Sequence, residues 1–229
     1  MSVSFLRHSG WVEPSVLDKP VSIIGVGAVG SNVALLAAKM GFTKFKIWDP
    51  DTVESHNLPN QAFDNQHVGM PKATAITEVL TRFNPEVKVE SYIDYFTTEK
   101  YKSELSGLLV IAVDTMSARK DLADAMKLNW RLNGIFETRL GFNHGEVHIM
   151  NSMDLPVIER WAAALKNDDE IEPGPCNLRL CSTLVYITSG YTVHMMCSLC
   201  AAQENKTEWK PASKQLFLLE DNLFQTYSK

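Results

Sequence analysis

The chain has 229 residues, of which 45% are hydrophobic and 21% charged, so one sizeable globular core is expected and a disordered chain is excluded. Because 27 acidic residues outnumber 22 basic ones, the net charge of −5 argues against a partner that is nucleic acid or an anionic membrane. No run approaches the ~20 apolar residues of a membrane span, and no secretory signal is visible, which predicts a cytoplasmic protein.

The first fifty residues predict a β-α-β unit. The apolar run VSIIG at residues 21–25 ends in glycine, and residues 27–41 continue with a helical pattern closed by Gly41. The next run, KFKIWD at residues 44–49, alternates and ends on an acid. This order indicates a buried parallel sheet with a right-handed crossover.

A long polar loop and a second helix follow. Residues 50–70 are rich in Asn and Asp and too long for a routine connection, which indicates a functional loop. Residues 72–83 carry apolar side chains at helical spacing, and Asn84-Pro85 ends that helix. Residues 87–96 alternate and predict a third strand.

The remaining part of the nucleotide core is predicted up to residue 150. LLVIAVD at residues 108–114 is a continuous apolar run that ends on Asp114, as in a central parallel strand. Residues 118–129 favour a helix, residues 134–140 a strand, and residues 146–150 its hairpin partner.

The last third changes character. Between residues 151 and 176 the composition shifts to KNDDEIEPGP, which is acidic with two prolines and predicts an exposed loop. Residues 181–203 predict a long buried helix, and residues 214–227 a last strand or hairpin. We therefore expect a single α/β domain over residues 1–229, with a nucleotide core at 21–150. Its sheet should be Rossmann-like, doubly wound and mostly parallel, with antiparallel strands at the C-terminal side.

A glycine motif lies between the first strand and helix. Gly25, Gly27 and Gly30 form GxGxxG, and with Ala28 they predict a loop where nucleotide phosphates approach the bare backbone and the N-terminus of the helix. Asp49, 22 positions after Gly27, suits a carboxylate that binds ribose hydroxyls. The plainer alternatives are a packing turn for the glycines and a helix cap for Asp49.

These residues alone do not separate a nicotinamide enzyme from an ATP enzyme, because both nucleotides share adenosine and a phosphate chain. Further motifs follow in order: DPDTVESHNLPNQ at 49–61, GMPK at 69–72, the NP of RFNPEVKVE, and VDTMSAR at 113–119. With them, residues 21–150 resemble the ubiquitin-activating-type adenylyltransferases of the HesA/MoeB/ThiF superfamily.

The resemblance implies binding of ATP and Mg²⁺ and adenylation of the C-terminal carboxylate of a ubiquitin-fold or sulfur-carrier protein ending in Gly-Gly. It implies that Asp49 holds the ribose, that Lys72 and Asn57 contact phosphates, and that Asp114 coordinates Mg²⁺ or orients the triphosphate. The plainer alternative for Asp114 is a cap at the end of a strand. Asp51 matches the second acid of the pattern and either contacts the nucleotide or braces the loop. The family also implies a homodimer.

One position departs from the family pattern. The family has N-L-x-R-Q, with the arginine on the phosphates, where this chain has Asn60. Asn60 carries no charge, so a phosphate-stabilising cation is missing there. Arg139 and the N-terminal Arg7 are the candidate replacements, and simple solvation is the alternative for Arg7.

The four cysteines do not match a zinc site. Cys197 and Cys200 form one CxxC pair, but Cys176 and Cys181 are separated by four residues, and about sixteen helical steps separate Cys181 from Cys197. We therefore do not expect zinc, and we interpret the thiols as reduced. Cys176, after the acidic loop, is the best-placed candidate nucleophile, with a structural thiol as the alternative.

Three functions follow from these observations. The leading hypothesis is an adenylyltransferase, and the second is a degenerate nucleotide-binding scaffold of the same fold, which Asn60 favours. The third is an NAD-dependent oxidoreductase, which only the first β-α-β unit supports.

Overall fold

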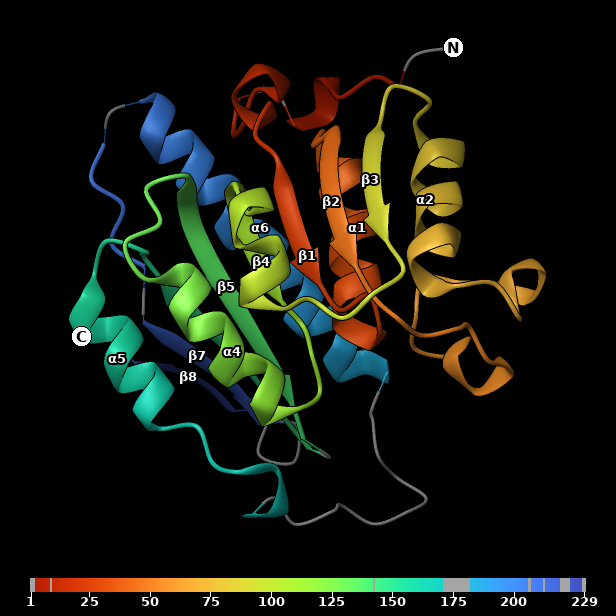
Figure 1. Ribbon diagram of the computed structural model, residues 1–229. Helices are drawn as coiled ribbons and strands as arrows, with labels where there is room; N and C mark the ends of the chain where they lie inside the picture. The colour runs from red at the N-terminus through yellow and green to blue at the C-terminus, as the bar shows by residue number, and fades with distance from the viewer. Residues whose placement is uncertain are drawn as a thin grey trace.

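The protein folds around one eight-stranded mixed sheet. The structure, a computed structural model, describes residues 3–8, 10–141, 143–170, 182–205, 207–211, 213–218 and 223–227. The strand order is β3-β2-β1-β4-β5-β6-β7-β8, with parallel pairing from β3 to β5 and antiparallel pairing from β5 to β8 (Figure 1). The prediction of a mostly parallel α/β sheet with antiparallel strands at the C-terminal side is confirmed.

The elements alternate along the chain as a parallel sheet requires. The strands are β1 (Val21–Ile24), β2 (Lys44–Trp48), β3 (Lys88–Tyr92), β4 (Gly107–Ile111), β5 (Leu132–Leu140), β6 (His144–Met150), β7 (Lys214–Leu218) and β8 (Leu223–Tyr227). The α-helices are α1 (Ala28–Met40), α2 (Lys72–Phe83), α3 (Thr98–Tyr101), α4 (Met116–Met126), α5 (Leu155–Ala163) and α6 (Ser182–Glu204).

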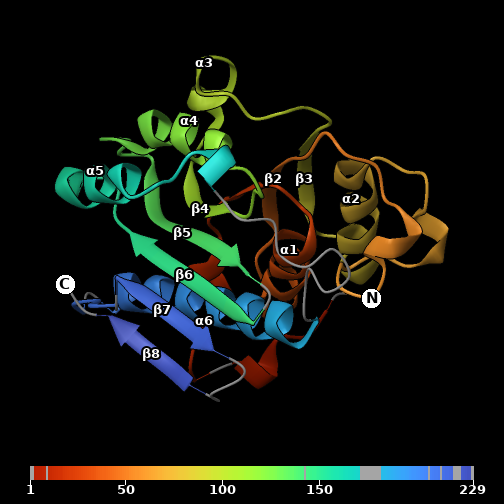
Figure 2. The same cartoon turned by 90° about the horizontal axis from the view of Figure 1, so that it is seen from below.

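Helices cover both faces of the sheet. On one face α1, α2 and α6 pack together over a core that includes Val33, Ile76 and Phe136. On the other face α3, α4 and α5 cover a second core that includes Leu109 and Ile135 (Figures 1 and 2). Because both faces of the sheet are covered, every residue of β1 and β4 is buried, and these strands are mostly apolar.

The strand order reverses between β1 and β4. The connections after β1 and β2 place α1 and α2 on one face, whereas those after β3 and β4 place α3 and α4 on the other. Such a reversal opens a crevice at the carboxyl ends of the strands, where open α/β sheets bind ligands. These ends point to the bottom of Figure 1.

Several predicted boundaries move by a few residues. The helix at 72–83 is confirmed as α2, but the third strand covers only Lys88–Tyr92 and α4 begins at Met116 instead of residue 118. The apolar run at 108–114 leaves the sheet at Ile111, so Asp114 lies in the loop before α4 and not at the end of a strand.

The prediction that residues 151–176 form only an exposed loop is wrong for residues 155–163. This segment is helix α5, which begins with an Asp154 side-chain cap and Pro156 in its first turn and buries Val157, Ile158 and Trp161. The three apolar residues fall on one helical face, so the helix completes the cover over β5.

The prediction of a long buried helix at residues 181–203 is confirmed by α6. By length and composition it is the one helix of the described residues that could cross a membrane, yet 56% of its most apolar stretch is buried. It packs on α1, β5 and β6, which is the environment of a core helix. The tail forms the β7–β8 hairpin at the edge of the sheet.

Candidate functional site

The glycine motif forms a tight turn between β1 and α1. Gly25 has φ +85°, and a Cβ there would lie 2.7 Å from the Ala112 oxygen of the β4 end. A Cβ on Gly30 would lie 1.9 Å from the Gly25 oxygen, so the helix approaches the turn more closely than any side chain allows. The space beside Gly27, by contrast, is open within 4 Å.

Helix α1 presents its N-terminus at this opening. It begins at Ala28, and no side chain caps it at Gly27. The first N–H groups of a helix have no acceptor within the helix, and the helix dipole favours an anion beside them. The open space at Gly27 and the uncapped helix end fit a phosphate group.

Asp49 joins the end of β2 to the glycine turn. Its Oδ2 accepts a hydrogen bond of 2.7 Å from the Val26 N–H, and its Oδ1 accepts one of 2.9 Å from the Asp51 N–H. Burial raises the pKa of this carboxyl above its usual value of 3.8, although the two N–H donors and Lys72 lower it. Asp49 is thus fixed at the rim of the turn, as the ribose prediction requires.

Lys72 and Asp51 form an ion pair beside Asp49. Lys72 is the first residue of α2, its side chain is 10% exposed, and its Nζ lies 2.8 Å from Asp51 Oδ2. Its backbone N–H also donates to the Asp51 oxygen at 2.8 Å. Asp51 thus braces the loop against Lys72, and it also lines the cleft, so both roles that the sequence left open for it stay predictions.

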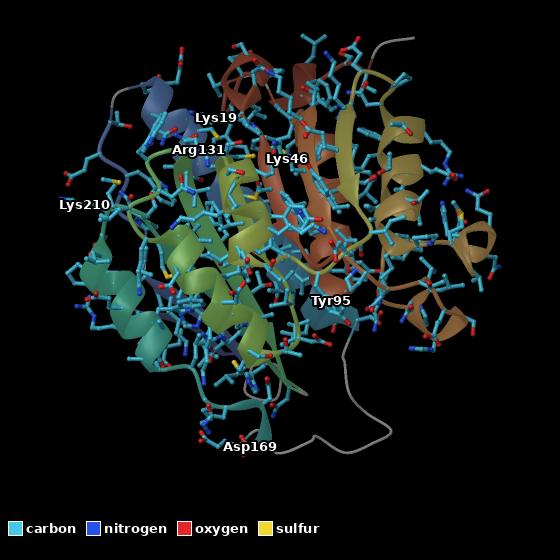
Figure 3. The ribbon with its side chains drawn as sticks, in the orientation of Figure 1. Lys19, Lys46, Tyr95, Arg131, Asp169 and Lys210 are labelled. Carbon is cyan, nitrogen blue, oxygen red and sulfur yellow. The ribbon has the colours of Figure 1, made fainter. Side chains whose placement is uncertain are left out.

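These groups line a single cleft of about 590 Å³ at the carboxyl ends of the strands. Its lining includes the aromatic side chains of Trp48, Tyr95 and Phe96 as well as charged and polar ones. Figure 3 shows Tyr95 at this end of the sheet and Lys19 at the other. Two residues that line the cleft have a buried polar atom without a hydrogen-bond partner, namely Gln61 Oε1 and Trp48 Nε1. A nucleotide fits a cleft of this size and chemistry.

Asp114 lies exposed at the cleft, just before α4. No group of three His, Cys, Asp or Glu side chains within the described ranges could hold a metal ion alone. A Mg²⁺ bound to nucleotide phosphates needs only one or two carboxylates from the protein, and Asp114 can supply one.

Asn57 and Asn60 of the polar loop do not line the cleft. Asn57 Oδ1 accepts from the Glu54 N–H in a local capping arrangement around Ser55–Asn57. The backbone oxygen of Asn60 accepts a hydrogen bond of 2.9 Å from Asn32 Nδ2 on α1. The position where the family has an arginine therefore connects the polar loop to this helix. The phosphate contact assigned to Asn57 remains a prediction.

A buried charge cluster borders the cleft at β5. Arg139 lines the cleft, and its Nε donates to both oxygens of Glu137, at 2.8 and 3.1 Å. Glu137 is fully buried and also accepts from Arg119 Nε at 2.7 Å and from Trp161 Nε1 at 3.1 Å. The sequence analysis missed Glu137, although an acid within the apolar strand GIFETRL was a signal.

The remaining candidates lie elsewhere. Arg7 is exposed on the 3-10 helix Leu6–His8, and His8 Nε2 lies 3.2 Å from the Lys39 oxygen in the last turn of α1. Arg7 is therefore at the opposite end of α1 from the cleft and cannot serve the cleft of its own chain. Cys176 lies outside the described residues.

The other described thiols are buried in α6. Burial raises the pKa of Cys197 to about 12 and that of Cys200 to about 11, so both are protonated and unreactive at neutral pH. This agrees with their interpretation as reduced thiols of a core helix.

Comparisons with known proteins agree with this geometry. The ThiF family profile matches residues 14–210. Ubiquitin-like modifier-activating enzyme 5 of Drosophila pseudoobscura pseudoobscura is 31% identical over 139 residues, which cover 53% of this chain and 35% of that protein. The enzyme of the same name from Oryza sativa subsp. japonica is 33% identical over 108 residues, or 47% and 26% of the two chains. The chain thus spans about a third of the length of the first relative and about a quarter of the second.

Solved structures share the fold. E. coli MccB with AMPCPP and MccA has a TM-score of 0.72 at 13% identity, over 94% of this chain and 65% of that chain. PaaA has a TM-score of 0.70 at 18% identity, over 93% and 64%. At these identities the similarity establishes the shared architecture.

Proposed function

Because the chain belongs to the ThiF family, we propose that it is an ATP-dependent adenylyltransferase acting on the C-terminal carboxylate of a ubiquitin-like or sulfur-carrier protein that ends in Gly-Gly. The names of the relatives support the class of acceptor. The observation that carries the proposal is the meeting of the glycine turn, Asp49 and Lys72 around one cleft.

The cleft suits a reaction that needs positioning and charge neutralisation. In adenylation an acceptor carboxylate oxygen bonds to the α-phosphorus of ATP, and the bond to the leaving pyrophosphate breaks. The protein then has to hold the ribose, neutralise phosphate charge and exclude water. Asp49 suits the first task, while Lys72 and the N-terminus of α1 suit the second. Mg²⁺, which Asp114 would help to hold, would supply further charge on the phosphates.

A second candidate is a nucleotide-binding scaffold that does not turn ATP over. Asn60 favours it, because its uncharged side chain supplies no cation where the family pattern has an arginine. Loss of a cation that stabilises a phosphoryl-transfer transition state can lower the rate by ~10³ or more.

The test is ATP–pyrophosphate exchange by the purified protein with Mg²⁺ and candidate carriers ending in Gly-Gly. Lys72→Ala should abolish carrier-dependent exchange, because it removes the cation beside the glycine turn. Lys44→Ala is the matched control, since Lys44 pairs with Asp18 at the amino end of β2 and should leave exchange unchanged. Nucleotide binding without exchange would support the scaffold, and binding of NADH in place of ATP would overturn both.

The homodimer and the cytoplasmic location belong to this proposal and stay predictions. Arg7 would enter only in a dimer, by reaching the cleft of a second copy. Gel filtration of the wild type, followed by exchange assays of Arg7→Ala, tests that role.

A further inference from the structure

The carboxylate of Glu137 is the centre of a cluster that holds three elements together. It lies on β5 with no exposed surface and accepts hydrogen bonds from Arg119 of α4, Arg139 of β5 and Trp161 of α5. Burial opposes its ionisation, but the Arg139 and Arg119 cations outweigh burial and hold the pKa of the Glu137 carboxyl below its usual range. Glu137 is therefore ionised at neutral pH.

The two arginines of the cluster differ in what they leave free. Arg119 is 4% exposed, and its Nη1 and Nη2 donate to the Thr115 and Thr138 oxygens at 3.3 and 3.1 Å. The Arg139 side chain is 21% exposed and bonds to Glu137 through Nε. Its Nη1 and Nη2 make no hydrogen bond to any described residue, so two donor groups remain available at the cleft.

The charged groups around Glu137 leave positive charge at this edge of the cleft. Arg119 and Arg139 both pair with Glu137, so these three side chains together carry one net positive charge. Glu146 on β6 is already paired, with Lys214 Nζ and His148 Nε2 each 2.8 Å away. Of the three cations that line the cleft within the described chain, Lys72 is paired with Asp51, and Arg119 and Arg139 share Glu137. Of the two arginines, Arg139 is the one whose Nη1 and Nη2 are left open.

The position of Arg139 indicates which anion it meets. Across the carboxyl ends of the sheet the order is Asp49 after β2, the glycine turn after β1, Asp114 after β4 and Arg139 on β5. A nucleotide anchored by its ribose at Asp49 and by its phosphates at the glycine turn leaves the β5 edge for the second substrate. The antiparallel strands β6 to β8 extend beyond this edge (Figure 2).

We propose that Glu137 is a positioning residue that holds Arg139 at the β5 edge of the cleft, where the Arg139 guanidinium binds the terminal carboxylate of the acceptor. This inference rests on the proposed function and adds to it the group that recognises the acceptor. A planar guanidinium with two free amino groups matches a carboxylate, which accepts two parallel hydrogen bonds.

The test compares two forms of one acceptor in the presence of a non-hydrolysable ATP analogue. The acceptor is a Gly-Gly carrier that supports exchange, prepared with a C-terminal carboxylate or with a C-terminal carboxamide. Wild-type protein should bind the carboxylate about 10- to 100-fold more tightly, the range for charge-assisted hydrogen bonds. Arg139→Gln and Glu137→Gln should reduce this ratio to about one, while the dissociation constant of the nucleotide changes less than about twofold.

The controls separate positioning from folding. Trp161→Phe removes one donor to Glu137 and should lower the ratio partially, which keeps the inference testable if Glu137→Gln does not fold. Arg131→Gln, at the amino end of β5 (labelled in Figure 3), should leave the ratio unchanged.

Each other result has a definite meaning. A wild type that binds both acceptor forms equally, or an Arg139→Gln protein that still discriminates, overturns the inference and leaves the proposed function intact. Arg139→Gln that weakens the nucleotide alone assigns Arg139 to the phosphates and also overturns it. No exchange with any carrier overturns the proposed function and this inference together.

Discussion

The glycine motif offers a sharp test because two of its members differ in what a methyl group would meet. A Cβ on Gly30 would lie 1.9 Å from the backbone oxygen of Gly25, whereas the space beside Gly27 is empty within 4 Å. Alanine at position 30 therefore forces α1 away from the turn by about 1 Å, because non-bonded carbon and oxygen atoms do not approach closer than about 3 Å.

The expected magnitude follows from this geometry. Overpacking of a rigid core contact costs about 3 kcal/mol, and the higher helix propensity of alanine offsets up to about 1 kcal/mol. Gly30→Ala should thus lower the free energy of unfolding by about 2–3 kcal/mol. Gly27→Ala should change it by less than about 1 kcal/mol, yet it places a methyl group where a phosphate would lie and should weaken nucleotide binding at least about tenfold.

Urea unfolding followed by circular dichroism measures the first quantity, and titration with a fluorescent ATP analogue measures the second. The two variants serve as controls for each other, since both replace glycine by alanine three residues apart. A Gly30→Ala protein as stable as the wild type would refute the close approach of α1. A Gly27→Ala protein with unchanged nucleotide affinity would refute the place of the phosphates.

Three further changes test the carboxylates. Because burial raises the pKa of Asp49 above 3.8, nucleotide affinity measured between about pH 7 and pH 4 should begin to fall before an ordinary aspartate protonates, and Asp49→Asn should bind more weakly with a flat profile. Burial disfavours ionised Glu146, but His148 and Lys214 outweigh it and lower the pKa from 4.5 to about 2. Its stabilising contribution is therefore complete above pH 4.5 and lost as the pH falls toward 2. Urea unfolding at several pH values should show that Glu146→Gln costs about 1–2 kcal/mol at neutral pH and little near pH 2. Asp114→Asn should raise the Mg²⁺ concentration for half-maximal exchange about tenfold while nucleotide binding without metal stays unchanged.

The part of the fold that the sequence predicted well depends on local signals. The β-α-β unit, α2 and α6 were predicted from local signals: glycines, the spacing of apolar residues and helix stop residues. Asp49 was also predictable, because the crossover from β1 to β2 has a nearly fixed length and brings the end of β2 beside the glycine turn.

Helix α5 was not predicted because the acidic composition within residues 151–176 was taken to describe the whole segment. The acidic residues 166–172 follow the helix, and they obscured the apolar face formed by Val157, Ile158 and Trp161. Asp154 and Pro156 are a start signal that should have outweighed composition. The roles of Asn57 and Asp51 were incompletely predicted for another reason, since a motif fixes neighbours in sequence but not which hydrogen bonds form.

The Glu137 cluster could not be predicted in detail, because its partners come from positions 119, 139, 148 and 161 on four elements. A single acid within an apolar strand is equally compatible with a strand edge that faces water. Only the packing of α4 and α5 over β5 shows that this acid is buried among cations.

The energetics of this cluster favour a binding role over a purely structural one. A fully buried carboxylate costs several kcal/mol of desolvation, and an apolar residue of similar volume often gives equal or greater stability. One cation is enough to balance the charge of Glu137, and the cluster holds two, Arg119 and Arg139, so it keeps one net positive charge. What the cluster does accomplish is to fix a flexible side chain before any ligand arrives, and ordering such a side chain on binding otherwise costs about 0.5–1.5 kcal/mol. This advantage exists only if an anion binds at the β5 edge, because Nη1 and Nη2 of Arg139 have no acceptor among the described residues.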